Sequence, residues 1–151
     1  MINITDQELY DVKKLVGLPY KHLGRNYLEG LDCMGFLIHA YNICGYKVLD
    51  CCPQYEEDFS KTGKNYILNN IVEQWTQTDY PEIGDLCLMG LPLPHHLGIS
   101  IGNDRIIHCM RGFGVLITPV RILKQVYGWY SFTDQFQIET KLWTDHILSQ
   151  Q

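Results

Sequence analysis

The chain has 151 residues, of which 46% are hydrophobic and 19% charged, a composition typical of one compact domain over residues 1–151 and unlike a disordered segment. The net charge of -5 and the scattered Lys and Arg argue against a nucleic-acid partner, which requires a basic face. No stretch approaches the roughly 18 apolar residues of a membrane span, so we expect no membrane partner. The N-terminal residues lack the pattern of a secretory signal, so we expect synthesis in the cytoplasm without a signal peptide.

The first half of the chain predicts helices. Residues 5–8 read Thr-Asp-Gln-Glu, a capping box that predicts a helix running to about Val16. A second helix is predicted before Gly45 by apolar residues at helical spacing, namely Phe36, Leu37, Ala40, Tyr41 and Cys44. Residues 46–65 are predicted to be irregular, and 66–75 a short helix.

The second half predicts strands. The candidates are Asp85–Met89, Leu97–Ile101, Arg105–Met110, Val115–Val120 and Tyr127–Phe132, with a tight turn at 102–104. A weaker strand around Phe136 and a short C-terminal helix complete the chain. Leading helices followed by hairpin-connected strands indicate an α+β fold, with N-terminal helices packed on an antiparallel sheet of about five to six strands.

Cysteine use points to one candidate nucleophile. Of the six cysteines, Cys33 stands directly before the second predicted helix, and we interpret all six as reduced thiols because no secretory signal is present. A cysteine at a helix N-terminus faces the positive end of the helix dipole and unpaired N–H groups, which lower a thiol pKa. Those N–H groups can also hold an oxyanion. The alternative is a small buried cysteine that merely opens the helix.

Two histidines are predicted to meet across a hairpin. His96 shares a strand face with Gly98 and Ser100, opposite the apolar residues of that strand, whereas His95 points the other way or lies before the strand. If the hairpin turns at the Asn-Asp pair, His108 lies on the neighbouring strand, close enough to orient the ring of His96. A nucleophile, a base and an orienting group form a catalytic triad, although a lone strand histidine is more often structural.

Four motifs then occur in order along residues 5–120: Gly17-Leu18-Pro19-Tyr20, Gly30-Leu31-Asp32-Cys33-Met34-Gly35, Pro81-Glu82-Ile83-Gly84-Asp85-Leu86, and His96-Leu97-Gly98-Ile99-Ser100-Ile101-Gly102 followed by Ile107-His108. Together they resemble the NlpC-type cell-wall cysteine peptidase family, which is papain-like in chemistry. The resemblance implies an NlpC-type fold, no metal and no cofactor.

The resemblance also implies roles for five residues. Cys33 would be the nucleophile, His96 the base and His108 the third polar member. Tyr20 would lie near the oxyanion site, and Asp32 would bind the amino group of the substrate. The reaction would be endopeptidase cleavage of a γ-D-glutamyl–diamino acid bond in peptidoglycan stem peptides.

Two departures from the family pattern bear on the setting of the protein. Met34 replaces the family serine after the nucleophile and is expected to narrow the pocket. A single domain without signal peptide is similar to the version found in phage tail-assembly genes. That version implies phage tail proteins as partners and delivery to the cell wall by the virion tail.

Three other functions remain open on sequence grounds. A metal-binding module could use the His and Cys residues, although no Cys-x-x-Cys or His-x-x-x-His pair is present. A structural tail protein could keep the same fold. An amidase, deamidase or acyltransferase could use the same triad on another acceptor.

Overall fold

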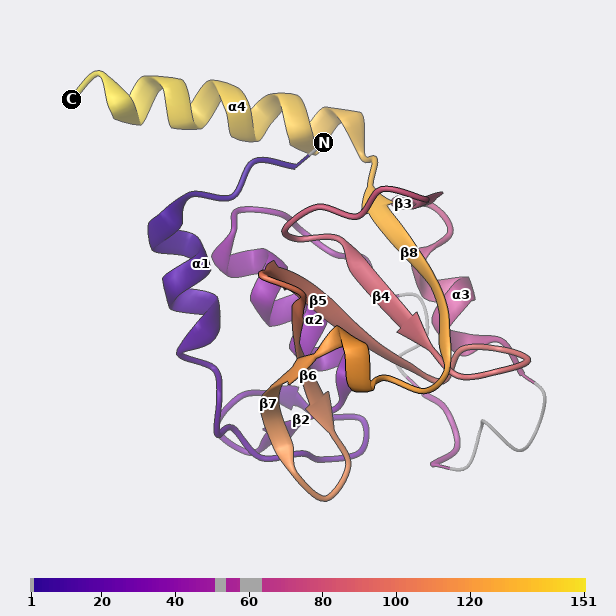
Figure 1. Cartoon of the computed structure of the whole chain (residues 1–151). Helices are drawn as coiled ribbons and strands as arrows, with labels where there is room; N and C mark the ends of the chain where they lie inside the picture. The colour runs from indigo at the N-terminus through magenta and orange to yellow at the C-terminus, as the bar shows by residue number, and fades with distance from the viewer. Residues whose placement is uncertain (1, 51–53, 58–63) are drawn as a thin grey trace.

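The structure, a computed structural model, describes residues 2–50, 54–57 and 64–151 (Figure 1). Its helices in chain order are α1 (Asp6–Lys13), α2 (Cys33–Ile43), α3 (Tyr66–Ile71), the 3-10 helix η2 (Val120–Ile122) and α4 (Gln135–Ser149). None of these described helices is long and apolar enough to cross a membrane. Cys51 and Cys52 lie outside the described residues, and the other four cysteines are free thiols, as predicted.

A six-stranded sheet forms the centre of the molecule. Its strands are β3 (Trp75–Thr78), β4 (Leu86–Met89), β5 (His96–Gly102), β6 (Arg105–Met110), β7 (Gly114–Pro119) and β8 (Val126–Phe132), in the spatial order β3-β8-β4-β5-β6-β7. Every neighbouring pair is antiparallel. A separate two-stranded hairpin pairs β1 (Arg25–Asn26) with β2 (Gly30–Leu31). The predicted α+β architecture is therefore confirmed.

The predicted capping box opens α1. The hydroxyl of Thr5 accepts from the backbone N–H of Glu8, and the carboxylate of Glu8 accepts from the backbone N–H of Thr5. The helix ends at Lys13, earlier than predicted. After Lys13 the backbone forms the i to i−3 hydrogen bonds of a tighter 3-10 turn, such as the one from the N–H of Val16 to the carbonyl of Lys13.

The prediction of one helix over 66–75 is wrong at its end. The helix α3 stops at Ile71, and Trp75 opens the edge strand β3 opposite Phe132 of β8. Trp75 also packs against Tyr41 in a tilted arrangement and against Phe132 edge to face, at ring-centroid distances of 5.4 and 5.0 Å. Burial of this aromatic group overrides the local preference for helix.

The predicted strand around Phe136 is also wrong, because Phe136 lies in the first turn of α4. Asp134 is the N-cap of this helix, and its side chain accepts from the backbone N–H of Gln137. This cap gives a hydrogen-bond acceptor to an N–H group in the first turn of the helix, and it therefore favours a helix at these residues. The C-terminal helix is accordingly 15 residues long rather than short.

The strand β5 presents its faces as predicted. Its apolar residues Leu97, Ile99 and Ile101 are all buried in the main core cluster, which also contains Phe36 and Leu37 of α2. The turn to β6 places Asn103 and Asp104 at positive φ, the conformation of a tight hairpin turn. The helix α2 contacts both β5 and β6, so the helix and the β5–β6 hairpin lie close together.

Two glycines let the β1–β2 hairpin approach the start of α2. A Cβ atom on Gly35 would lie 2.0 Å from the carbonyl oxygen of Gly24, and one on Gly24 would lie 2.2 Å from that of Gly30. Neither position tolerates a side chain without movement of the backbone. The glycine of the Asp32-Cys33-Met34-Gly35 sequence is therefore required by packing.

We predict that Gly35→Ala lowers the free energy of unfolding by about 1–3 kcal/mol, the usual cost of overpacking. Chemical denaturation monitored by circular dichroism would measure this. Gly128→Ala is the matched control, because the added Cβ would meet no backbone atom, only the end of the Gln77 side chain at 3.0 Å and the Tyr130 ring at 3.5 Å. Equal stability of the Gly35→Ala and wild-type proteins would contradict the packing argument.

Candidate active site

Cys33 is the first residue of α2, where the sequence placed it. Asp32 is the N-cap, with an extended backbone and a side chain that accepts from the backbone N–H of Gly35 at 2.8 Å. The backbone N–H of Leu97, directly after His96 on β5, lies near the thiol and acts to lower its pKa. The side chain of Cys33 thus lies between the start of α2 and the start of β5.

His96 and His108 meet across the hairpin as predicted. Nε2 of His96 lies 2.7 Å from Nδ1 of His108, and Nε2 of His108 lies 2.8 Å from the hydroxyl of Thr118 on β7. Gly98 makes room for this pair, since a Cβ there would lie 3.2 Å from the Cβ of His108. Two assignments of protons satisfy both contacts, because the Thr118 hydroxyl can donate or accept; in the one that suits a base, His96 donates to His108, and His108 donates to Thr118. This assignment leaves Nδ1 of His96 as an acceptor.

Burial favours the neutral form of both the thiol and the histidines. Burial, followed by the charge of Asp32, raises the pKa of Cys33 to about 12. Burial, with His108 and His95 nearby, lowers the pKa of His96 to about 3, and burial lowers that of His108 to about 4. The thiol pKa therefore moves in the opposite direction from the sequence-based expectation, because desolvation outweighs the helix dipole.

Cys33 and His96 border one cleft with a volume of about 670 Å³. Tyr20 and Asp32 border it as well, so the cleft gathers four of the five predicted site residues. His108 lies behind His96 at 3% exposure. The remaining lining residues are Tyr55, Glu57, Met89, Gly90, His95, Met110, Arg111, Leu123, Lys124 and Gln125.

Tyr20 stands on the cleft wall with a cation beside its hydroxyl. Burial raises the pKa of the Tyr20 hydroxyl, while a hydrogen bond with Arg111 partly offsets that effect. The hydroxyl is therefore protonated at neutral pH and able to donate into the cleft. Arg111 also donates from Nη2 to the backbone carbonyl of Glu57, at 2.9 Å.

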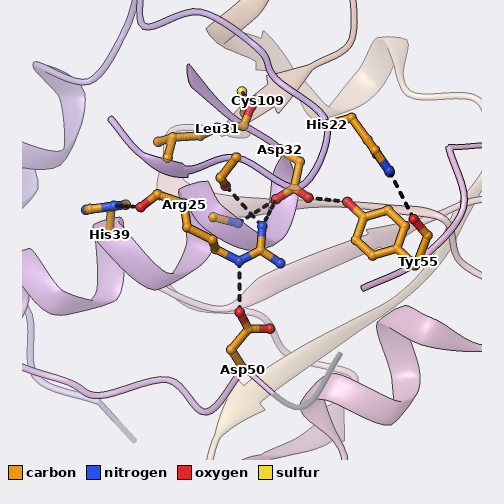
Figure 2. A network of polar contacts seen from close by, with 10 residues as sticks. His22, Arg25, Leu31, Asp32, His39, Asp50, Tyr55 and Cys109 are labelled. Atoms are coloured by element: carbon orange, nitrogen blue, oxygen red, sulfur yellow. Dashed lines mark hydrogen bonds and ion pairs between the residues drawn. The ribbon is translucent and has the colours of Figure 1, made fainter. Parts of the chain in front are cut away.

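Asp32 is engaged by the protein on both carboxylate oxygens (Figure 2). Its Oδ1 accepts from the N–H of Gly35 and from Nη1 of Arg25 at 2.7 Å, and its Oδ2 accepts from the hydroxyl of Tyr55. The side chain is only 1% exposed. Asp32 is thus a buried cap and ion-pair partner, and its predicted role in binding a substrate amine is untested.

Arg25 connects this carboxylate to the rest of the hairpin (Figure 2). Its Nε donates to Asp50 at 2.9 Å and its Nη1 to the carbonyl of Gly24 at 3.0 Å. His39 contacts the carbonyl of Arg25 at 2.8 Å. Burial opposes the charge of Arg25, but Asp50 and Asp32 together raise its pKa, so the guanidinium is a permanent cation.

Comparison with known proteins places the chain in a family. A profile of the NlpC/P60 family matches residues 17–146. The chain belongs to the NlpC/P60 family. Members of this family are cysteine peptidases and peptidoglycan hydrolases, so the chain is assigned to the cysteine peptidases, and the assignment supports cell-wall hydrolase activity. No curated protein sequence matches the chain.

Solved structures share the NlpC/P60 fold at low identity. The NlpC/p60 domain of the peptidoglycan hydrolase SagA aligns with a TM-score of 0.58 and 20% identity, over 86% of this chain and 100% of that one. A family protein from Bacillus cereus aligns with a TM-score of 0.61 and 22% identity, over 87% of this chain and 41% of that one. RipB from Mycobacterium tuberculosis, a peptidoglycan hydrolase, aligns with a TM-score of 0.51 and 18% identity, over 83% of this chain and 64% of that one.

Met34 does not occupy the place expected of it in the NlpC/P60 cleft. It is 1% exposed, packs in the main core cluster and is absent from the cleft lining. A step of one residue along α2 turns its side chain by about 100° from that of Cys33, away from the cleft. The expectation that Met34 narrows the pocket is therefore wrong.

Sequence reasoning missed four residues of the NlpC/P60 site. The contact between Thr118 and His108 depends on the register of β6 with β7. In that register His108 lies opposite Leu116, and Thr118 is two residues further along β7. Arg25, Tyr55 and Lys124 come from separate loops and hairpins, and no local pattern marks them. In the described part of the chain, no three His, Cys, Asp or Glu side chains form a group that could hold a metal.

We predict that a limiting amount of iodoacetamide labels Cys33 before Cys44, Cys87 and Cys109. Burial raises the pKa of all four thiols to about 12, so acidity does not separate them. The four thiols differ instead in their access to the reagent, because among them only Cys33 borders the cleft. Peptide mapping by mass spectrometry would give the order. Labelling of Cys44 or Cys87 first would show that the cleft does not admit the reagent.

Proposed function

We propose that the protein is a peptidoglycan endopeptidase that cleaves the γ-D-glutamyl–diamino acid bond of stem peptides with Cys33 as nucleophile and His96 as base. The observation that carries the proposal is the convergence of the Cys33 thiol and the His96–His108 pair on one cleft, from α2 and from the β5–β6 hairpin. The family assignment supports cell-wall hydrolysis as the class of reaction, and the bond that is cleaved is part of our proposal.

Attack begins with proton transfer inside the cleft. The thiol of Cys33 gives its proton to Nδ1 of His96, and the sulfur attacks the carbonyl carbon of the scissile amide. His108 accepts the hydrogen bond from Nε2–H of His96 before and after this transfer. It therefore keeps the imidazolium oriented without itself exchanging a proton, and Thr118 holds His108 in turn.

The tetrahedral intermediate carries a negative charge on the former carbonyl oxygen. Backbone N–H groups at the start of α2 and the Tyr20 hydroxyl are the donors proposed to stabilise it. The imidazolium of His96 then protonates the leaving amine, and the carbon–nitrogen bond breaks to leave a thioester on Cys33. Water activated by the neutral His96 attacks the thioester, releases the carboxylic acid and restores the thiol.

Neutral resting groups suit this cleft. An isolated thiolate or imidazolium would be strongly destabilised by burial, as the raised pKa of Cys33 and the lowered pKa of His96 show. The two charges are favourable only as an adjacent pair, in which each stabilises the other. The charged state is thus formed when the proton crosses to His96, beside the carbonyl under attack.

Phage tail partners and virion localisation stay predictions. Mass spectrometry of purified virions, compared with the lysed host fraction, would test them. An amidase or acyltransferase acting through the same residues would cleave or acylate a different acceptor. Identification of the products formed from isolated peptidoglycan distinguishes these reactions from endopeptidase cleavage.

We predict that Cys33→Ala abolishes release of products from peptidoglycan and that His96→Ala reduces the rate by about 100- to 10,000-fold, the usual cost of losing a positioned base. Liquid chromatography with mass spectrometry of the muropeptides would measure both. His95→Ala is the matched control, because His95 is exposed and packs over Gly90 instead of contacting His108. Loss of activity in His95→Ala with retention in His96→Ala would overturn the assignment of the base.

The pKa of His96 also predicts the acid limb of the pH profile. Since burial lowers this pKa to about 3, His96 remains neutral and able to accept a proton well below pH 6.5. We therefore expect kcat/KM to change little between about pH 7 and 5 and to fall only in stronger acid. Circular dichroism at each pH is the control, because His96 and His108 bind protons more readily when unfolded and destabilise the fold in acid. An acid limb centred near pH 6.5 in folded protein would contradict the role.

A further inference from the structure

The cleft runs along one edge of the six-stranded sheet. On that edge the start of β8 lies beside the end of β4, the end of β4 beside the start of β5, and the end of β6 follows. The cleft lining takes residues from each of these strand ends, namely Lys124 and Gln125 before β8, Gly90 after β4, His96 on β5 and Arg111 after β6. Along this edge His96 therefore has Arg111 on one side and Lys124 on the other.

The nucleophile and the proposed oxyanion donor lie on the β6 side of His96. The thiol of Cys109 on β6 donates to the carbonyl of Leu31 at 3.0 Å, so the segment that leads into Cys33 lies against β6. Tyr20 forms a parallel bridge with the same Leu31. The β8 side of His96 is thus left for the other half of the substrate.

The proposed mechanism places the leaving residue on that free side. The leaving amine must meet the imidazolium of His96 to receive its proton, so the residue that carries the amine extends past His96, away from Cys33. Two strand spacings, roughly 10 Å, separate the start of β5 from the start of β8. The side chains of a diamino acid and of Lys124, approaching from either side, span such a gap.

Lys124 is an unpaired cation on a short segment that is fixed at both ends. The N–H of Leu123 donates to the carbonyl of Val120 at 3.0 Å, and the carbonyl of Gln125 accepts from the N–H of Gly90 at 2.7 Å. The Lys124 side chain is exposed, and within the described residues its ammonium has no hydrogen-bond or ion-pair partner. The backbone thus holds a charge at the β8 end of the cleft that the protein itself does not neutralise.

The formally charged residues elsewhere in the lining belong to the other half of the cleft. Arg111 donates to the backbone carbonyl of Glu57, and Asp32 caps the helix that begins at Cys33. A lone ammonium at the β8 end attracts a carboxylate and repels a second ammonium. Diamino acids differ in this respect, because a lysine side chain ends in an ammonium whereas that of diaminopimelate also carries a carboxylate. Amidation of the carboxylate removes its charge.

We propose that Lys124 is a specificity-determining residue that binds a carboxylate of the leaving diamino acid, so that the enzyme prefers diaminopimelate with free carboxylates to its amidated form and to lysine. This inference rests on the proposed endopeptidase function. It names the leaving residue, which that function leaves open.

The test compares three tripeptides that share L-alanyl-γ-D-glutamate: one ending in diaminopimelate, one with its side-chain carboxylate amidated and one with its α-carboxylate amidated. Liquid chromatography with mass spectrometry gives kcat/KM for each. At least one amidation should lower kcat/KM of the wild-type protein by about threefold or more, the range of an exposed ion pair, and added salt should reduce this loss. The amidation that lowers it identifies the carboxylate bound. In Lys124→Met the three peptides should be cleaved about equally.

The outcomes separate this inference from the proposed function. Losses below about threefold for both amidations, or losses of the same size in Lys124→Met, would overturn the role of Lys124 while leaving the endopeptidase intact. Cleavage of none of the three peptides would overturn both.

Charge reversal gives the sharpest variant. Lys124→Glu should invert the order, so that the amidated peptide and the L-lysine tripeptide become better substrates than the free diaminopimelate form. Arg121→Glu is the matched control, because it changes the net charge by the same amount while Arg121 is exposed on η2 and absent from the cleft lining. It should retain the wild-type order. An equal inversion in Arg121→Glu would overturn the inference, since the preference would then follow the overall charge of the protein.

Discussion

The carboxylate of Asp32 holds three separate parts of the chain at the start of α2. It caps the helix through Gly35, pairs with Arg25 of the β1 hairpin and accepts from Tyr55 of the 54–57 segment. Because Cys33 is the next residue, movement of this carboxylate would also move the proposed nucleophile. A buried carboxylate requires partners to offset its desolvation, and here those partners also form the cleft wall. Folding and the placement of the thiol are thus coupled at one side chain.

The β5–β6 hairpin contributes the second half of the site by a different principle. Strand alternation turns His96 toward the cleft while Leu97 turns into the core, and the antiparallel register brings His108 beside it. The rings are oriented by hydrogen bonds to each other and to Thr118, and no carboxylate in the described part of the chain is hydrogen-bonded to either ring. The two halves of the site are therefore held differently. An ion pair with Asp32 supports the start of α2, whereas hydrogen bonds between neutral groups hold His96.

Local patterns predicted the parts of this site that local structure determines. The helix start at Cys33 and the phase of His96 each depend on spacing within a few residues, and the structure confirms both, whereas the N-cap position of Asp32 was not predicted. Partners brought together from distant segments were not predictable in the same way. Tyr55 donates to Asp32 from 23 residues further along the chain, and Trp75 opens a strand because of an aromatic cluster built by residues distant in sequence. These outcomes depend on tertiary contacts that no short window of sequence contains.

The cleft draws its walls from points spread along the chain, from Tyr20 through Cys33, Tyr55 and His96 to Lys124. Contacts between residues so distant in sequence form slowly, since each requires closure of a long loop. During synthesis the thiol emerges from the ribosome well before the histidine that would activate it. A nascent chain or a fragment ending before β5 lacks the base entirely. Under the proposed mechanism the peptidase is therefore inactive until the strand that carries His96 has been made and paired, and this order of synthesis limits premature hydrolysis.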